Sequence, residues 1–300
     1  MRAGMIQTVL NSTFLEPKYC DTGSIHDVRM RIMKAQLWNV LRSAVRLSPE
    51  RLRLAFLEQP LTVPMDFGGI KITAHSSEEY YIRAGSAAKE PETVGWLLDM
   101  PKHAVFVDVG ANIGAYSLIA AQLYPEVRIL AIEPSAPTFA SLCHNIWINR
   151  LHDRITPVCA VLGRTNGPGA FSYSSWQPGA ALHGLGQEGQ HWHLSFKLDD
   201  LVGFLRFPQP THLKIDVDGA EQDVLAGAAE TLQFIQSLMI EVDENHGSSE
   251  SIKRTLEDSG LAIVSCHRTD AAGRYVNYRY DRVSKCVNVG ERSSSRKTDS

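Results

Sequence analysis

Apolar residues form short, nearly continuous runs in the middle of the chain, and each run is followed by a segment whose apolar positions recur at helical spacing. The first run, Ala104-Val-Phe-Val-Asp-Val109, leads directly into a helical pattern over 113–123. Strands that are apolar on both faces and alternate with helices are typical of a mostly parallel sheet covered on both sides. The chain is therefore predicted to have a doubly wound, Rossmann-like α/β fold. Further strands are expected over 127–132, 155–161, 211–216, 237–242, 261–266 and 275–280, and further helices over 136–149, 219–232 and 248–258.

The pattern differs at both ends of the chain. Two helices rich in Lys and Arg are expected over 25–58, with a solvated basic face, although a membrane surface or an acidic partner would also fit. A hairpin around Asp66-Phe-Gly-Gly69 and a helix over 91–98 follow. We predict three parts: a helical and hairpin extension (1–98, a lid or cap), a catalytic domain (99–285) and a disordered tail without apolar anchors (286–300).

The stretch from Gly163 to Gln190 is rich in Gly, Ser, Pro and aromatic residues and has no helical period. Such a stretch inside an α/β domain is either a surface excursion or a substrate loop, and the sequence favours neither.

Composition narrows the choice of partner and compartment. The 300 residues are 44% hydrophobic and 21% charged, and the formal charge of −3 provides no global attraction for a nucleic acid. No apolar run approaches the length of a membrane span, and the N-terminus lacks the features of a signal peptide. The five cysteines are scattered and form no CxxC pair, which is typical of thiols in a reducing compartment. We expect a soluble, cytoplasmic protein.

The turn after the first strand, Asp108-Val-Gly-Ala-Asn-Ile-Gly114, carries the candidate cofactor site. Ligands of open α/β sheets bind beyond the carboxyl ends of the strands, where Gly110 allows a tight turn and Gly114 lets the helix pack closely. A dinucleotide would prefer a glycine where Asn112 stands, so a nicotinamide or flavin cofactor is disfavoured. S-adenosylmethionine fits better, with Asp108 as a direct or water-mediated partner of its ammonium group.

A second acid follows at the end of the next strand, in Ala131-Ile-Glu-Pro134. Glu133 is placed to accept hydrogen bonds from both ribose hydroxyls, and Ser135 follows as the N-cap of the next helix. A ligand-free glycine turn and a solvated Glu133 are the alternatives. Strand, glycine turn, helix, strand and Glu-Pro in this order indicate a class I methyltransferase.

Charged residues also end the strand at 211–216, in Leu213-Lys-Ile-Asp-Val-Asp-Gly-Ala-Glu221. Period-two geometry puts Lys214, Asp216 and Asp218 toward one face unless the strand bends before Asp218. Charges at the end of a buried strand are costly unless they are paired or functional. A structural Lys-Asp pair with helix-capping acids remains the alternative.

These motifs together resemble the FkbM family of methyltransferases over roughly residues 88–266. The resemblance implies O-methylation of a small-molecule, sugar or polyketide hydroxyl by S-adenosylmethionine. Asp218 stands where the family often has Glu, and the part before about residue 60 lies outside the resemblance. The motifs are Asp108–Gly114 with Tyr116-Ser117, Glu133-Pro134 followed by Asn145, Leu198–Leu201, Lys214–Glu221 with Val224-Leu225 and Gly227-Ala228, and Ile240–Val242.

A neutral hydroxyl is a poor nucleophile and needs a general base or a metal. Asp216 is the first candidate base, and Lys214 could lower its pKa, which would make it a weaker base but a better positioning group. Asp218, Glu221 and Glu241 are further carboxylates that could orient the acceptor or bind a divalent ion, whose involvement stays open. Four histidines are weaker candidate bases: His183, His191, His193 and His246.

Three other functions remain possible. An N-methyltransferase would commonly carry an Asn/Asp-Pro-Pro-Tyr turn where this chain reads Asp216-Val-Asp-Gly219. A dinucleotide oxidoreductase is disfavoured by Asn112, and a non-catalytic S-adenosylmethionine-binding module would need neither acidic cluster. The sequence identifies neither the acceptor nor the oligomeric state.

Overall fold

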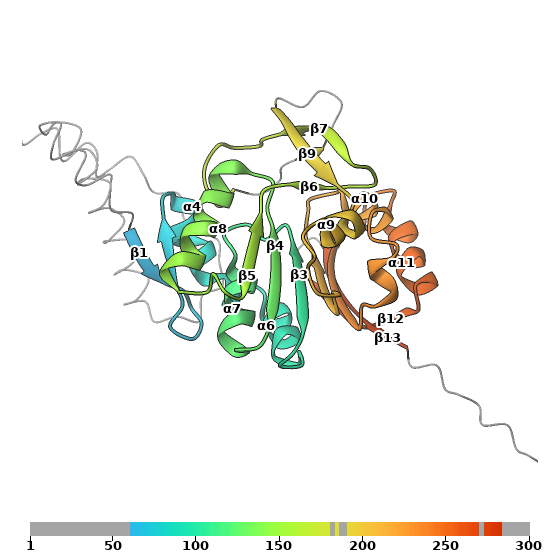
Figure 1. The fold of residues 1–300 in the computed structure, drawn as a ribbon, viewed down its shortest axis with the longest axis horizontal. Helices are drawn as coiled ribbons and strands as arrows, with labels where there is room; N and C mark the ends of the chain where they lie inside the picture. The colour runs from blue at the N-terminus through green and yellow to red at the C-terminus, as the bar shows by residue number, and fades with distance from the viewer. Residues whose placement is uncertain (1–60, 181–183, 186–190, 270–272, 284–300) are drawn as a thin grey trace, which may run out of the picture. The chain divides into compact units, whose positions relative to one another are not determined.

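The computed structural model describes residues 61–180, 184–185, 191–269 and 273–283 (Figure 1). The helices predicted over 25–58, the tail predicted over 286–300 and the candidate base His183 lie outside the described residues. Every described residue belongs to one compact unit, Pro60–Ser300. None of the helices in the described part of the chain combines the length and apolar character that a membrane crossing requires.

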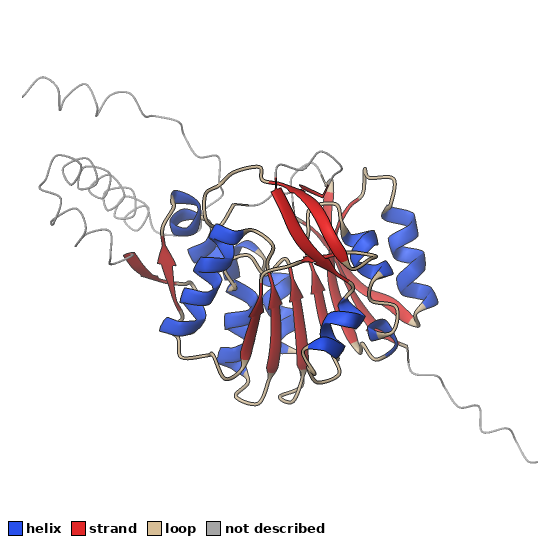
Figure 2. Cartoon of the chain, turned by 45° about the horizontal axis from the view of Figure 1, so that its top comes forward, coloured by secondary structure: helices blue, strands red, loops and turns tan. Residues whose placement is uncertain are grey.

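A seven-stranded sheet forms the centre of this unit, and it confirms the predicted doubly wound fold (Figure 2). Its strand order is β12-β13-β11-β10-β3-β4-β5, and only β13 runs antiparallel to its neighbours. The last strand in sequence is not at the edge of the sheet, because β13 inserts between β11 and β12. The strands are β3 (Val105–Val109), β4 (Arg128–Ile132), β5 (Ile155–Val158), β10 (His212–Ile215), β11 (Ser237–Asp243), β12 (Leu261–Arg268) and β13 (Tyr275–Arg282).

The sheet has an apolar core on each face, as continuous apolar strands require. Phe106 of β3 lies in one core, and its neighbour Val107 lies in the other. The first core contains residues of α6 (Pro91–Leu98), α7 (Ala115–Leu123) and α8 (Ala136–Ile148), and the second those of α9 (Leu198–Phe204), α10 (Glu221–Ala226) and α11 (Ser249–Asp258).

The helix predicted over 219–232 is shorter than expected and breaks into α10 and the 3-10 turn η2 (Thr231–Gln233). The helix ends at Gly227, where the chain touches another part of the backbone. A Cβ at Gly227 would lie 2.1 Å from the carbonyl oxygen of Gly163. This contact is long-range, so the local helical pattern does not indicate it.

The predicted hairpin is present as β1 (Leu61–Pro64) and β2 (Lys71–Ala74), paired antiparallel. Buried Asn145 of α8 links this hairpin to the glycine turn, because its Oδ1 accepts from the Thr73 amide at 2.8 Å and its Nδ2 donates to the Ile113 carbonyl at 3.0 Å. The division between an extension ending at residue 98 and a domain starting at residue 99 stays a prediction. The intervening short helices are α4 (Ser77–Tyr81), η1 (Arg83–Gly85) and α5 (Ser86–Lys89).

A second, four-stranded sheet follows β5 at the carboxyl end of the main strands (Figure 2). The sequence pattern did not reveal it, and the strand predicted over 155–161 divides between β5 and this sheet. In its strand β9, Trp192 and Leu194 are exposed, so the apolar residues of β9 do not mark a buried face. The strands are β6 (Val161–Leu162), β7 (Gly167–Ser172), β8 (Gly184–Leu185) and β9 (His191–Phe196), in the order β6-β9-β7-β8.

Candidate active site

The glycine turn joins three neighbouring strands at their carboxyl ends. Gly110 has φ +78°, and a Cβ there would lie 1.8 Å from the backbone oxygen of Asp216. The amides of Gly110 and Ala111 both donate to the Ile132 carbonyl, at 3.0 and 2.9 Å. Gly110 is therefore required by both its backbone conformation and its close approach to β10.

Asp108 lies at the base of this turn and is fully buried. Its Oδ2 accepts a hydrogen bond from Ser117 Oγ at 2.7 Å, whereas its Oδ1 has no partner among the described residues. Burial raises the pKa of Asp108, and the Lys214 cation opposes that rise. A buried carboxylate oxygen without a partner is costly, and the ammonium group of S-adenosylmethionine, directly or through water, fits it chemically.

Glu133 ends β4 and is 4% exposed. Its two carboxylate oxygens accept from the amides of Asn112 and Ser135, at 2.9 and 2.8 Å. Burial raises the pKa of Glu133 to about 7, although these two hydrogen bonds oppose the rise. Each oxygen keeps a lone pair, so the residue still fits a ribose diol.

Ser135 occupies the N-cap position of α8, but its hydroxyl does not cap the helix. It donates instead to Thr138 Oγ1 at 3.2 Å. Through its amide, Ser135 orients the Glu133 carboxylate.

Lys214 and Asp216 form an ion pair, with 2.8 Å between Nζ and Oδ2. The Lys214 side chain is 4% exposed and that of Asp216 is 31% exposed, so the pair opens toward solvent at the carboxylate. Burial alone would lower the pKa of Lys214. The negative charges of Asp216, Asp108 and Glu90 outweigh this effect and raise the pKa. Burial raises the pKa of Asp216, but Lys214 outweighs that effect and holds it below its usual range.

Glu241 of β11 lies beside this pair. The parallel register sets Lys214 opposite Met239 and Ile215 opposite Ile240, which brings Asp216 next to Glu241. Burial, together with the negative charges of Asp216 and Glu90, raises the pKa of Glu241 to about 8, against opposing effects of Lys214 and Thr269. The two carboxylates therefore differ: Asp216 is held ionised, whereas Glu241 titrates near neutral pH.

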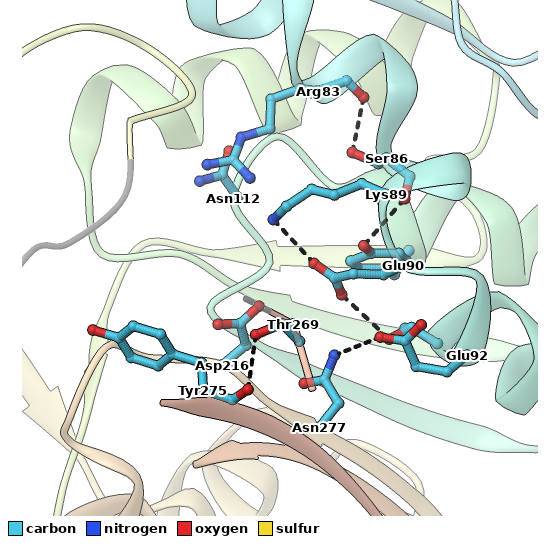
Figure 3. A network of polar contacts seen from close by, with 12 residues as sticks. Arg83, Ser86, Lys89, Glu90, Glu92, Asn112, Asp216, Thr269, Tyr275 and Asn277 are labelled. Carbon is cyan, nitrogen blue, oxygen red and sulfur yellow. Dashed lines mark hydrogen bonds and ion pairs between the residues drawn. The ribbon is translucent and has the colours of Figure 1, made fainter. Parts of the chain in front are cut away.

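Further residues, which no sequence motif indicated, lie on the other side of these acids (Figure 3). Glu90, just before α6, is 7% exposed and accepts from Lys89 Nζ and Thr93 Oγ1, both at 3.2 Å. Asn277, opposite Glu241 in the β11–β13 register, donates to Glu92 Oε1 at 3.1 Å. No local motif marks these residues, because contacts far apart in the chain bring them together.

Asp218 takes a different place from Asp216. Strand β10 ends at Ile215, and Asp218 has φ +54°. Burial is the main cause of the raised pKa of Glu133 and of Glu221, and the negative charge of Asp218 adds to both. Glu221 Oε1 accepts from the Gly219 amide at 2.9 Å. The strand thus bends before Asp218, as the sequence analysis had allowed, and the structure groups Asp218 with Glu133 and Asp216 with Glu241.

The described histidines lie in other settings. His246 Nδ1 lies 2.7 Å from Ser248 Oγ, and Tyr173 Oη lies 3.1 Å from His193 Nε2, in an aromatic group that includes His191. None of the three is among the groups that act most strongly on Asp216 or Glu241. Over the described ranges, no three His, Cys, Asp or Glu side chains are arranged to hold a metal ion.

Known proteins resemble the part of the chain that contains this site. The methyltransferase FkbM domain matches residues 108–260. Hexuronic acid methyltransferase AglP of Haloferax volcanii is 27% identical over 194 residues, which cover 64% of this chain and 77% of that protein. 31-O-demethyl-FK506 methyltransferase FkbM of Streptomyces tacrolimicus is 29% identical over 196 residues, which cover 55% of this chain and 75% of that protein.

Among solved structures, methyltransferase FkbM from Methylobacillus flagellatus aligns with a TM-score of 0.47 and 18% identity. The alignment covers 68% of this chain and 50% of that one. Since the matched family domain spans half of the sequence and contains both the glycine turn and the acidic pair, this chain belongs to the FkbM family of methyltransferases.

Proposed function

We propose that the protein transfers a methyl group from S-adenosylmethionine to a hydroxyl of a small acceptor, such as a sugar or a polyketide. The observation that carries this proposal is the pair of unlike carboxylates, Asp216 and Glu241, at the carboxyl edge beside the glycine turn. The names of two relatives, a hexuronic acid methyltransferase and a 31-O-demethyl-FK506 methyltransferase, support a hydroxylated acceptor. The net charge of −3 supports a small molecule over a nucleic acid.

The cofactor supplies an electrophilic methyl group on a sulfonium centre. Gly110 and Gly114 shape the turn that receives it, Asp108 takes the ammonium group, and Asn112 and Ser135 orient Glu133 toward the ribose hydroxyls. The free oxygen of Asp108 and the buried carboxylate of Glu133 support these roles. Asp218, which acts on Glu133, lies on this side of the site.

The acceptor hydroxyl must be aligned and must lose a proton. Lys214 keeps Asp216 ionised, which makes Asp216 a weak base but a strong hydrogen-bond acceptor, so we assign it the orientation of the hydroxyl. Glu241 has a pKa of about 8 and is therefore a stronger base than Asp216, and its ionised form, which increases as the pH rises toward 8, takes the proton. Activity with and without a chelator tests whether a divalent ion also takes part.

We further propose that residues 99–285 form the catalytic domain in a cytoplasmic protein and that the segment before it closes the acceptor side through Lys89 and Glu90. The described cysteines, at 143, 159 and 266, are free thiols, which supports a reducing compartment.

Calorimetric titration of the full chain with S-adenosylmethionine and, separately, with NADH tests the proposal. We expect S-adenosylmethionine to bind, Asp108→Ala and Glu133→Ala to weaken it, and the exposed control Asp153→Ala to leave it unchanged. An acceptor screen over hydroxylated sugars, polyketides and matched amines then tests O-methylation. Preference for NADH, or methylation of the amines alone, would overturn the proposal.

A further inference from the structure

Arg83 projects into the site from η1, upstream of the matched family domain (Figure 3). Its side chain is only 14% exposed. Two of its nitrogens, Nε and Nη2, donate to the same acceptor, the Gly179 carbonyl, at 2.9 and 2.8 Å. One edge of the guanidinium is thereby fixed in direction.

The Arg83 guanidinium is only loosely paired with a carboxylate among the described residues. The carboxylate paired with it is that of Glu78, which lies 4.0 Å from Nη2. Its third nitrogen, Nη1, has no acceptor among the residues that the structure describes. A largely buried guanidinium with an unused edge is costly unless an anion completes its contacts.

Arg83 lies over the cofactor turn. The Gly179 carbonyl that it holds is also 3.5 Å from Asn112 Nδ2, so the guanidinium and the turn share one acceptor. The charge of Arg83 opposes the rise in the pKa of Glu133 and helps to keep Asp216 ionised. The charge of Arg83 thus acts on both the proposed ribose acid and the proposed reaction centre.

A four-residue strap, Gln177–Ala180, holds Arg83 in this position. The strap carbonyls of Pro178 and Ala180 accept from Ser76 Oγ at 2.7 Å and from Asn112 Nδ2 at 3.0 Å. The Gly179 amide donates to Thr138 Oγ1 at 3.2 Å. The guanidinium is therefore oriented before any ligand arrives, which reduces the entropy lost on binding.

We propose that Arg83 binds the carboxylate of the methionyl end of S-adenosylmethionine, while the unpartnered oxygen of Asp108 takes the ammonium group. The proposal rests on the function proposed above. A planar guanidinium suits a carboxylate because it can donate two parallel hydrogen bonds. Arg83 would then be a cofactor-binding residue supplied from outside the matched family domain.

Calorimetry with two ligands tests this proposal without any turnover. Decarboxylated S-adenosylmethionine keeps the ammonium and sulfonium groups and lacks only the carboxylate. We expect the wild-type protein to bind S-adenosylmethionine about 10- to 100-fold more tightly than the decarboxylated form, because a charge-assisted hydrogen bond is lost. In Arg83→Met this preference should fall to about twofold or less.

Two control variants separate the contact from its surroundings. Gly179→Ala disturbs the strap, because Gly179 has φ +79° and a Cβ there would lie 2.9 Å from Glu79 Cγ, but it leaves the Arg83 charge in place. Lys89→Met removes a neighbouring cation that also acts on Asp216. Lys89→Met should keep the full preference for the carboxylated ligand, and Gly179→Ala should keep more of it than Arg83→Met does, even if both affinities fall.

The outcomes distinguish this inference from the proposed function. If the wild-type protein binds neither ligand, the proposed function fails. If both ligands bind wild type equally, or Arg83→Met keeps the full preference, the assignment of Arg83 is wrong while the proposed function stands. If Lys89→Met abolishes the preference as Arg83→Met does, the positive charge around the site and not the Arg83 contact discriminates, and the assignment is again overturned.

Discussion

The two halves of the site are built in different ways. On the cofactor side, Asp108, Gly110, Asn112 and Gly114 fall within seven consecutive residues, and Glu133 follows one strand later. On the acceptor side, Glu92 and Asn277 are 185 residues apart and meet through a hydrogen bond. The cofactor side is therefore determined by the local conformation of a tight backbone turn, whereas the acceptor side is determined by contacts between residues distant in the sequence.

The halves also differ in their polar contacts. Backbone amides of Asn112 and Ser135 satisfy the Glu133 carboxylate. Asp216 and Glu90 are instead satisfied by the flexible side chains of Lys214 and Lys89. Substitutions on the cofactor side should therefore change geometry and affinity, and those on the acceptor side should change charge and rate.

The largest effect is expected on the acceptor side, from Glu241→Gln. Loss of a general base costs about 10²- to 10⁴-fold in kcat. Because burial and nearby carboxylates raise the pKa of Glu241 to about 8, wild-type kcat/KM should rise with pH up to that value, and the variant should lose this dependence. Steady-state kinetics from pH 6 to 9 would measure both.

Two variants serve as controls for this experiment. Glu244→Gln, three residues further along the chain and bonded to Tyr278 and Lys253, should keep the rate and the pH profile. Asp216→Asn should mainly raise KM. If Asp216→Asn abolishes turnover while Glu241→Gln does not, the base is Asp216, as the sequence analysis first suggested.

The next effect is on stability, from Lys214→Met. Removing one partner of a buried ion pair costs about 3–5 kcal/mol of unfolding free energy. The lower end of this range is expected here, because the Asp216 carboxylate that is left behind is 31% exposed. Lys214 holds the pKa of Asp216 down, so this stabilisation is present above the usual carboxyl pKa of about 4 and is lost as the pH falls through the lower folded value. Urea unfolding should show a defect that is largest near pH 7 and shrinks below about pH 4.

Lys253→Met is the matched control for that measurement. Its ion pair with Glu244 is 3.0 Å long, against 2.8 Å for Lys214 and Asp216, but its lysine is 20% exposed instead of 4%. A pair open to solvent contributes about 0–1 kcal/mol. An equal loss in both variants would show that the Lys214 pair is not energetically special.

This contrast explains what the sequence could predict. The strands, the hairpin, the doubly wound sheet and the Lys214–Asp216 pair follow from local periodicity and spacing, and the structure contains them. The second sheet was not predicted, because Trp192 and Leu194 of β9 are exposed and the hydrophobic pattern of this strand does not indicate a buried face. Arg83 was missed because its fixed orientation depends on Gly179, 96 residues away. Glu90 was missed because its charge acts on Lys214 and Glu241, which are distant in the sequence.

A smaller effect is expected on the cofactor side, from Gly110→Ala compared with Gly69→Ala. The two glycines have nearly the same φ, +78° and +76°, so both variants bear a left-handed strain of about 1–2 kcal/mol. Only at Gly110 would the new Cβ meet backbone, at 1.8 Å, which adds about 1–3 kcal/mol. Equal unfolding free energies would show that the approach of Asp216 does not require glycine.

The smallest effect is the pH dependence of cofactor binding through Glu133. Burial raises the pKa of Glu133 to about 7, and ribose hydroxyls are bound best by the ionised carboxylate. A proton must therefore leave before binding, so affinity for S-adenosylmethionine should rise by up to about tenfold per pH unit below pH 7 and level off above it. Calorimetry from pH 5.5 to 8.5 measures this slope.

Two variants serve as controls for the slope. Glu133→Gln, which cannot ionise, should bind weakly and without the pH dependence. Ser135→Ala keeps the backbone amide that orients Glu133 and should retain the pH dependence. A slope that persists in Glu133→Gln would assign the proton to another group, such as Asp108, whose pKa burial also raises.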